Sequence, residues 1–124
     1  MSDRAYHLGI DLGTTFTACG LARDGRAEVV TLGVRTAAVP TVAHRLAGGA
    51  FLGGEAAENR AVSEPARVAR EFKRRLGDPT PLLLGGQPVD PTRLYAEVLG
   101  WVVDHARTTE GQGPELVAVT HPAT

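Results

Sequence analysis

The stretch GIDLGTT, residues 9–15, places a carboxylate, a glycine and two hydroxyls in a turn that follows an apolar run. Glycine lets a backbone approach an anion closely, successive N–H groups of a tight turn form a concave anion site, and threonine hydroxyls add donors. Asp11 beside such a turn is suited to hold magnesium through its waters, because that ion prefers oxygen ligands. The combination fits phosphate binding, and a hairpin turn with solvent-facing polar side chains is the alternative.

The residues around this turn read as short strands separated by glycines. Residues 7–32 form apolar runs on either side of an Asp-Gly pair at positions 24 and 25. Such a pair between strand-like runs is typical of a hairpin, so the pattern predicts three antiparallel strands. Two more hairpins are predicted, over residues 41–54 and 82–89, each around a Gly-Gly pair.

Helices are predicted in three places. Residues 54–62 are rich in alanine and glutamate and suit one or two helical turns. A helix over residues 64–76 is predicted from a proline near its start and a glycine after its end, and the longest helix is predicted over residues 90–111, which begin with Asp-Pro. The apolar run of residues 116–119 then predicts a buried strand that can lie parallel to the first.

Composition limits the class of protein. The 124 residues suit one domain, and 43% apolar with 22% charged residues indicates a soluble, folded chain. A net charge of -1 excludes general electrostatic binding to nucleic acid or an anionic membrane. The single cysteine, Cys19, excludes an internal disulfide and a cysteine-based zinc cluster. We find no signal peptide and no membrane span in the sequence, so we expect a cytoplasmic protein.

Lys73 is the only lysine, against twelve arginines. A compact ammonium differs from a planar guanidinium, so a sole lysine suggests a position where arginine will not serve, with chance survival as the alternative. On the helix predicted over residues 64–76, Arg67, Arg70 and Arg74 share one face. We interpret that face as solvated surface, because glutamates lie nearby and no aromatic residues alternate with the arginines.

Five segments of the chain resemble the actin-like ATPases, and within them the seventy-kilodalton heat-shock chaperones. GIDLGTTFT resembles the family's first phosphate loop and REFKRRLG its lysine-bearing helix. The supporting segments are RTAAVPTVA, LGGEAAENRA followed by proline, and VAVTHPAT. In the last of them Pro122 matches the family's proline at the crossover between lobes, whereas His121 stands where the family has an aliphatic residue.

The resemblance implies an α/β fold, namely the first lobe of an actin-like, ribonuclease H-like ATPase with helices packed on a mixed sheet. Residues 1–124 would then be the N-terminal lobe of a nucleotide-binding domain, ending before the second lobe. The resemblance also implies that ATP and Mg²⁺ are the ligands. The implied contacts to the ATP phosphates are Gly13, Thr14, Thr15 and Phe16, that to magnesium is Asp11, and that to the γ-phosphate and attacking water is Lys73.

The implied function is that of the ATP-binding lobe of a heat-shock-type chaperone ATPase involved in protein folding. Its partners would be unfolded polypeptide and co-chaperones, bound through parts outside these residues, and the chain alone is expected to be inactive because it holds half a site. One alternative is a sugar or acid kinase of the same superfamily, which the lysine-bearing segment disfavours. The other is a non-catalytic interaction module.

Overall fold

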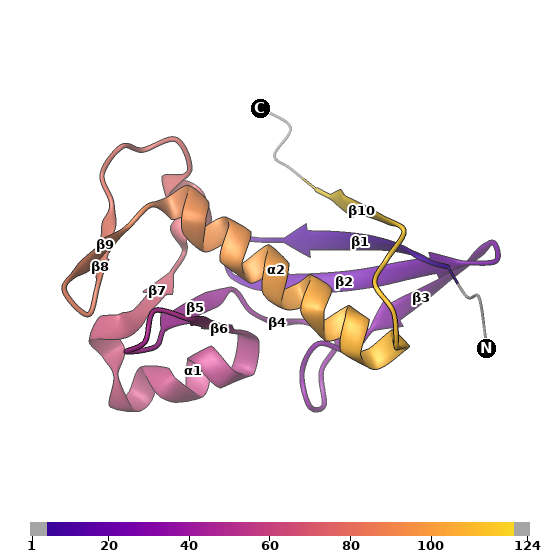
Figure 1. Ribbon diagram of the computed structural model, residues 1–124, viewed down its shortest axis with the longest axis horizontal. Helices are drawn as coiled ribbons and strands as arrows, with labels where there is room; N and C mark the ends of the chain where they lie inside the picture. Colours follow the sequence, from indigo (N-terminus) through magenta and orange to yellow (C-terminus); the bar gives the residue numbers. More distant parts are fainter. Residues whose placement is uncertain (1–4, 121–124) are drawn as a thin grey trace.

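The computed structural model describes residues 5–120, whose main sheet is built around the first strand (Figure 1). That strand, β1, pairs in parallel with β10 and antiparallel with β2, and the sheet order is β10-β1-β2-β3, with the short β4 paired to β2. The three predicted N-terminal strands are therefore confirmed. The bounds are β1 (His7–Leu12), β2 (Phe16–Arg23), β3 (Arg26–Val30), β4 (Val39–Pro40) and β10 (Leu116–Val119).

One face of this sheet packs on the core. Residues alternate along β1, so that Leu8, Ile10 and Leu12 are buried while the residues between them are exposed. The long helix α2 (Pro91–Glu110) crosses the buried face and contributes four buried apolar side chains to the same cluster (Figure 1). The other face of the sheet is left open and carries small residues, among them Gly9 and Gly20.

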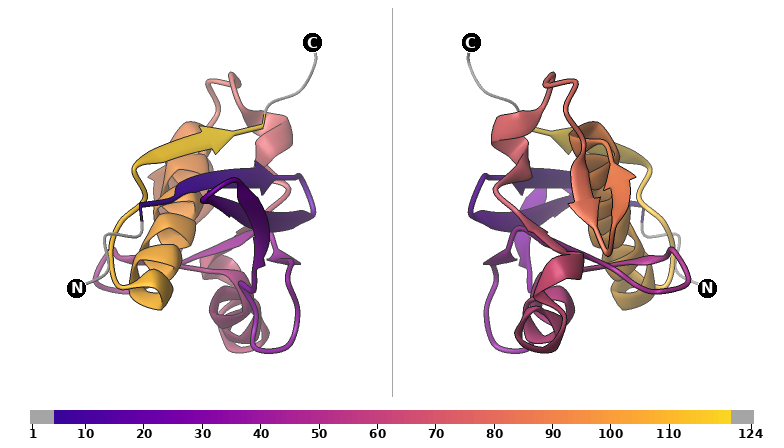
Figure 2. Two further views of the ribbon diagram at one scale, coloured as in Figure 1. Left: turned by 90° about the vertical axis from the view of Figure 1, so that its right-hand side faces the viewer. Right: turned by 90° about the vertical axis from the view of Figure 1, so that its left-hand side faces the viewer.

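A second, smaller sheet lies at the other end of the molecule. Its order is β6-β5-β7, helix α1 packs against β5, and a separate hairpin joins β8 to β9 (Figures 1 and 2). The predicted hairpins over residues 41–54 and 82–89 and the predicted helical turns over residues 54–62 are confirmed. The bounds are β5 (Val42–Arg45), β6 (Phe51–Gly53), α1 (Gly54–Ser63), β7 (Val68–Arg70), β8 (Leu82–Leu84) and β9 (Gln87–Val89).

The helix predicted over residues 64–76 is wrong. Two 3-10 turns, η1 (Pro65–Arg67) and η2 (Phe72–Arg75), flank β7 instead. Residues of β7 pair with β5, where buried Ala69 lies opposite buried Ala43, and this long-range pairing outweighs the local helix signals. The shared arginine face predicted on that helix is therefore absent. Each of its three arginines has its own partner: the Arg45 carbonyl for Arg67, Glu58 for Arg70 and Glu71 for Arg74.

The strand predicted over residues 116–119 is confirmed as β10 and lies parallel to β1, but the prediction that it is buried is wrong. Leu116 is 52% exposed and Val117 is 41% exposed. The reason is topological: β10 is an edge strand, and α2 lies across the middle of the sheet. Pro122, which carried part of the family resemblance, and His121, which departs from the family pattern, lie outside the described residues.

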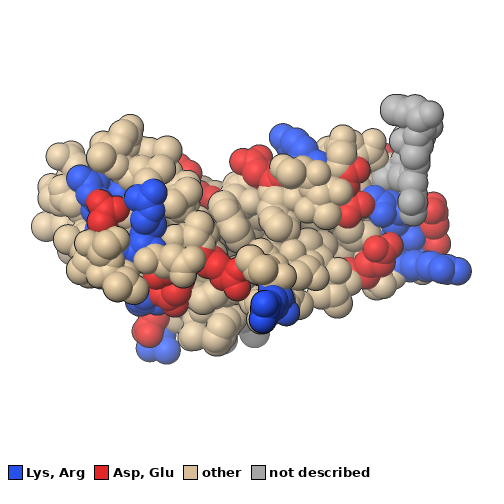
Figure 3. Space-filling view, turned by 90° about the horizontal axis from the view of Figure 1, so that it is seen from below, with Lys and Arg blue, Asp and Glu red and all other residues tan. Residues whose placement is uncertain are grey.

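Charges of both signs are mixed on the face shown in Figure 3, where basic and acidic side chains lie interspersed. This distribution agrees with the small net charge of the chain. Among residues 5–120, neither helix combines the length and the hydrophobicity that a membrane-crossing helix needs.

Replacing Asp90 with alanine is expected to destabilise the fold by about 1 kcal/mol. The Asp90 carboxylate caps α2 by accepting a 2.8 Å hydrogen bond from the amide of Thr92, and Pro91 occupies the first helical position. Urea denaturation followed by circular dichroism measures the change. Asp104→Ala, which removes an exposed carboxylate from the middle of the same helix, is the control and should cost nothing; equal losses for both variants would contradict the capping role.

Candidate functional site

The turn between β1 and β2 is held from both sides. The amide of Gly13 donates a 2.9 Å hydrogen bond to the carbonyl of Phe16, and the amide of Thr41 donates a 2.8 Å bond to the carbonyl of Thr15. A side-chain carbon at position 13 would lie 2.7 Å from the Phe16 oxygen, which is closer than real contacts allow. Glycine is thus required at position 13 by the close approach of the turn's own backbone.

A buried hydroxyl pair fixes the base of this turn. The Oγ1 atoms of Thr17 and Thr41 are 2.7 Å apart, and both residues are almost completely buried. The bond joins β2 to the residue before β5 and so ties the main sheet to the smaller one. The sequence analysis did not predict this pair. The one feature of the sequence that could have indicated it is a threonine, Thr17, at a position of β2 where the alternation of buried and exposed residues calls for an apolar side chain.

A small hollow lies against the turn. Its volume is about 140 Å³, which is about the space of a few waters, so it suits a group the size of a phosphate and not a whole nucleotide. Four parts of the chain that are distant in sequence meet there: the turn, the start of β5, helix α1 and the end of β7. The lining residues are Thr14, Thr15, Phe16, Pro40, Thr41, Val42, Glu58, Arg70 and Glu71.

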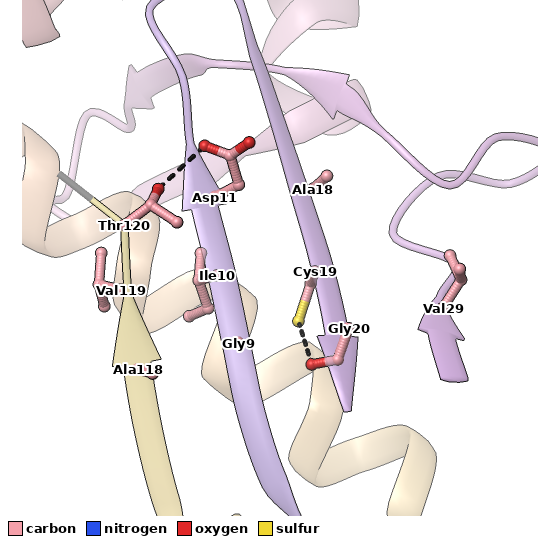
Figure 4. A pocket seen from close by; sticks show the side chains of 10 residues that line it. All are labelled: Gly9, Ile10, Asp11, Ala18, Cys19, Gly20, Val29, Ala118, Val119 and Thr120. Carbon is pink, nitrogen blue, oxygen red and sulfur yellow. Dashed lines mark hydrogen bonds between the residues drawn. The ribbon is translucent and has the colours of Figure 1, made fainter. Parts of the chain in front are cut away.

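Asp11 lies at a different hollow. Its Oδ1 atom accepts a 3.0 Å hydrogen bond from the hydroxyl of Thr120, which follows β10 (Figure 4). The two side chains stand where the parallel strands β1 and β10 end, at one end of a hollow of about 410 Å³ over the open face of the sheet. Carboxyl ends of parallel strands are where open α/β sheets bind ligands. Thr120 was not among the residues that the sequence singled out for this site.

The donor set around Asp11 fits magnesium only with help from other ligands. Within the described part of the chain, no three His, Cys, Asp or Glu side chains lie close enough together to hold a metal ion. Magnesium is commonly held by one or two carboxylates with waters and substrate phosphates supplying the remaining oxygens. One exposed carboxylate beside one hydroxyl is consistent with that mode of binding and not with a metal cage formed by protein alone.

Cys19 lines the same hollow but offers no reactive thiolate. Its side chain is 5% exposed, and its Sγ lies 3.9 Å from the carbonyl of Gly20 (Figure 4). Burial raises the pKa of the thiol to about 11, so the group stays protonated at neutral pH. This agrees with the interpretation of Cys19 as a small buried apolar residue of the strand.

Lys73 lies on η2, just after the residues that line the small hollow. Phe72, which is fully buried, anchors this turn in the core, and the backbone enters it through Glu71 at a φ of 53°. Among residues 5–120 the Lys73 ammonium has no ion-pair partner, whereas Arg70 and Arg74 both pair with glutamates. Lys73 is not one of the residues that line either hollow described above.

The structure therefore divides the predicted site residues into three places. Thr14, Thr15 and Phe16 share the small hollow, Asp11 faces the larger one, and Lys73 stands on the adjoining η2 segment. Arg70, Glu58 and Glu71 join the turn residues without having been predicted there. Together these features define a mixed α/β domain in which the glycine turn after β1 borders a hollow of about 140 Å³.

Comparison with known proteins places this domain in a family. The family described as "Hsp70 protein" matches residues 7–81, so the chain belongs to the Hsp70 family. It is 33% identical over 120 residues to the chaperone protein DnaK of Elusimicrobium minutum, covering 94% of this chain and 19% of that protein.

Two further relatives agree with this assignment. The DnaK of Halobacterium salinarum is 31% identical over 118 residues, covering 94% of this chain and 18% of that protein. The heat shock 70 kDa protein BIP3 of Oryza sativa subsp. japonica is 37% identical over 70 residues, covering 56% of this chain and 10% of that protein. The chain thus spans no more than about a fifth of the length of these relatives.

Proposed function

We propose that this chain is the phosphate-binding first lobe of a heat-shock-type chaperone ATPase with an actin-like, ribonuclease H-like fold. The observation that carries the proposal is the turn at residues 13–16. Glycine is required there because a side-chain carbon at position 13 would lie 2.7 Å from the Phe16 carbonyl oxygen, and the turn opens on a phosphate-sized hollow. Membership of the Hsp70 family supports ATP as the source of that phosphate.

In this proposal Gly13, Thr14, Thr15 and Phe16 wrap the ATP phosphates. Phosphoryl transfer depends on positioning and charge neutralisation more than on covalent chemistry, so a rigid turn contributes by fixing the phosphates in place. Asp11 and Thr120 face the hollow where a hydrated magnesium ion would reach them, and that ion would neutralise phosphate charge. Lys73, which has no ion-pair partner within the described residues, is the cation proposed for the γ-phosphate and the attacking water.

The remaining parts of the proposal concern the whole protein. Residues 1–124 supply one lobe, and a second lobe supplies the rest of the nucleotide site. ATP hydrolysis is then coupled to binding of unfolded polypeptide, with co-chaperones as partners and the cytoplasm as the location. A sugar or acid kinase is disfavoured because residues 7–81, which include Lys73, match the Hsp70 family.

We expect this chain alone to bind Mg-ATP more weakly than about 1 μM, which corresponds to about -8 kcal/mol. The small hollow holds phosphate and leaves the adenosine without the apolar pocket that normally carries ligand affinity. Calorimetry gives the affinity, and amide chemical shifts of Gly13, Thr14 and Thr15 locate the ligand.

Three outcomes of this titration decide between the functions. Shifts at the turn with weak affinity support the proposal. Affinity tighter than about 1 μM would mean that one lobe carries more of the site than is proposed here. No shift at the turn at millimolar Mg-ATP would favour a non-catalytic interaction module. Adenosine without phosphates is the matched control ligand, and it should leave the turn amides unchanged.

A further inference from the structure

Arg70 is the one cation among the residues that line the small hollow. It is the last residue of β7, and its neighbour Ala69 is buried on the opposite side of the strand. Strand alternation therefore turns the Arg70 side chain away from the core, toward the hollow that it shares with Thr14 and Thr15. The sequence analysis predicted Arg70 on the solvated face of a helix, and that prediction did not place it beside Thr14 and Thr15.

A glutamate holds the Arg70 guanidinium at this hollow. Nη2 of Arg70 donates a hydrogen bond to Oε1 of Glu58 on α1, and Glu58 lines the hollow as well. This bond lowers the pKa of the Glu58 carboxyl and raises that of Arg70, so both groups are charged at neutral pH. The Arg70 side chain is 51% exposed and that of Glu58 38%, so water and small anions reach the pair.

Such an exposed ion pair is easily exchanged. Pairs of this kind contribute little to stability, whereas a guanidinium binds phosphate through two parallel hydrogen bonds. The second carboxylate of the hollow, Glu71, has Arg74 as its own neighbour, with 3.9 Å between Oε1 and Nη1, which reduces its repulsion of an incoming anion. An anion that enters beside Thr14 and Thr15 thus competes with Glu58 alone for Arg70.

We propose that Arg70 is a phosphate-contacting residue of this site and that Glu58 occupies its guanidinium until the phosphate enters. The inference rests on the proposed function, because the phosphate is that of the nucleotide held by the turn. It assigns the two members of one ion pair opposite effects: Arg70 favours anion binding, and Glu58 opposes it. A pair that served only the fold would give both residues effects of the same sign.

The test uses this chain with inorganic tripolyphosphate and with Mg-ATP as probes, followed by amide chemical shifts up to millimolar ligand. Arg70→Gln is expected to weaken the binding of both probes roughly tenfold, as loss of a charged hydrogen-bond donor commonly does. Glu58→Gln is expected to strengthen it about threefold, because the competing carboxylate is gone. Arg93→Gln is the matched control, since Arg93 on α2 also pairs with a glutamate, Glu97, but neither residue lines the hollow, and it should leave binding unchanged.

Three results would overturn the inference. If Arg70→Gln binds both probes as the Arg93→Gln control does, Arg70 does not contact the phosphate, and the proposed function stands. If Glu58→Gln weakens binding as Arg70→Gln does, and urea denaturation shows that both variants lose stability, the pair is structural. An unmodified chain whose turn amides respond to neither probe would overturn the proposed function and this inference together. Arg70→Lys keeps the ion pair and should bind both probes with intermediate affinity. That result would show that the weaker binding of Arg70→Gln does not come from misfolding.

Discussion

Replacing Phe72 with alanine is expected to cost the fold roughly 3–5 kcal/mol. Phe72 is fully buried on η2, which packs against α2, and it belongs to the apolar cluster that also contains the buried side chains of α2. Truncating a buried aromatic side chain removes its transfer free energy and leaves a cavity that the neighbours fill only partly. The loss is a large share of the roughly 5–15 kcal/mol by which natural domains are stable, so the urea midpoint of the variant should lie well below that of the parent chain.

Urea denaturation of the variant beside the parent chain measures this loss. Phe16→Ala is the matched control, because Phe16 is 58% exposed at the turn and should cost less than about 1 kcal/mol. Phe72→Leu should retain most of the stability, since it keeps an apolar side chain in the same space. A Phe72→Ala variant as stable as Phe16→Ala would mean that η2 is not anchored in the core.

The features predicted correctly from the sequence depend on local turn chemistry. The Asp24-Gly25 hairpin forms because both residues adopt the positive φ that such a turn needs, and Gly85-Gly86 repeats this between β8 and β9. Asp90 caps α2 through an amide two residues away. Each of these signals acts between residues that are close in sequence. It can therefore be recognised without knowing which distant residues pack together.

The features that the sequence did not reveal depend on distant partners. Proline and glycine bracket residues 64–76 as they would a helix, yet pairing of β7 with β5, more than twenty residues away, decides the structure there. Arg70 with Glu58 and Thr120 with Asp11 are joined across 12 and 109 positions. No local spacing rule connects such residues, and so the turn was predicted while Glu58, Arg70 and Glu71, which line its hollow from other segments, were not.

The largest kinetic effect is expected for Lys73→Ala, in a form of the protein that also carries the second lobe. On the proposed function, Lys73 meets charge that develops during phosphoryl transfer more than it meets the phosphate of bound ATP. Removing one preorganised donor of this kind commonly lowers turnover roughly 10²–10³-fold, which is about 3–4 kcal/mol. Nucleotide affinity should change little, in contrast to the effect expected for Arg70→Gln.

Two further variants separate charge from geometry at the same site. Lys73→Arg should fail to restore turnover, because a planar guanidinium cannot take the place of a compact ammonium. Asp11→Asn should weaken magnesium-dependent ATP binding, because it removes the carboxylate that stands with Thr120 at the end of β1. Arg74→Ala, on the same η2 turn, is the control and should keep the parent rate.

Single-turnover hydrolysis measured beside equilibrium ATP binding distinguishes these effects. The proposed role of Lys73 is supported by its surroundings. Lys73 follows the buried Phe72 and has no ion-pair partner among residues 5–120, whereas Arg70 and Arg74 are both paired with glutamates. If Lys73→Ala hydrolyses ATP at the parent rate, the ammonium is an ordinary surface charge on η2. The catalytic part of the proposal would then be lost, whereas phosphate binding by the turn and Arg70 would remain to be judged by affinity alone.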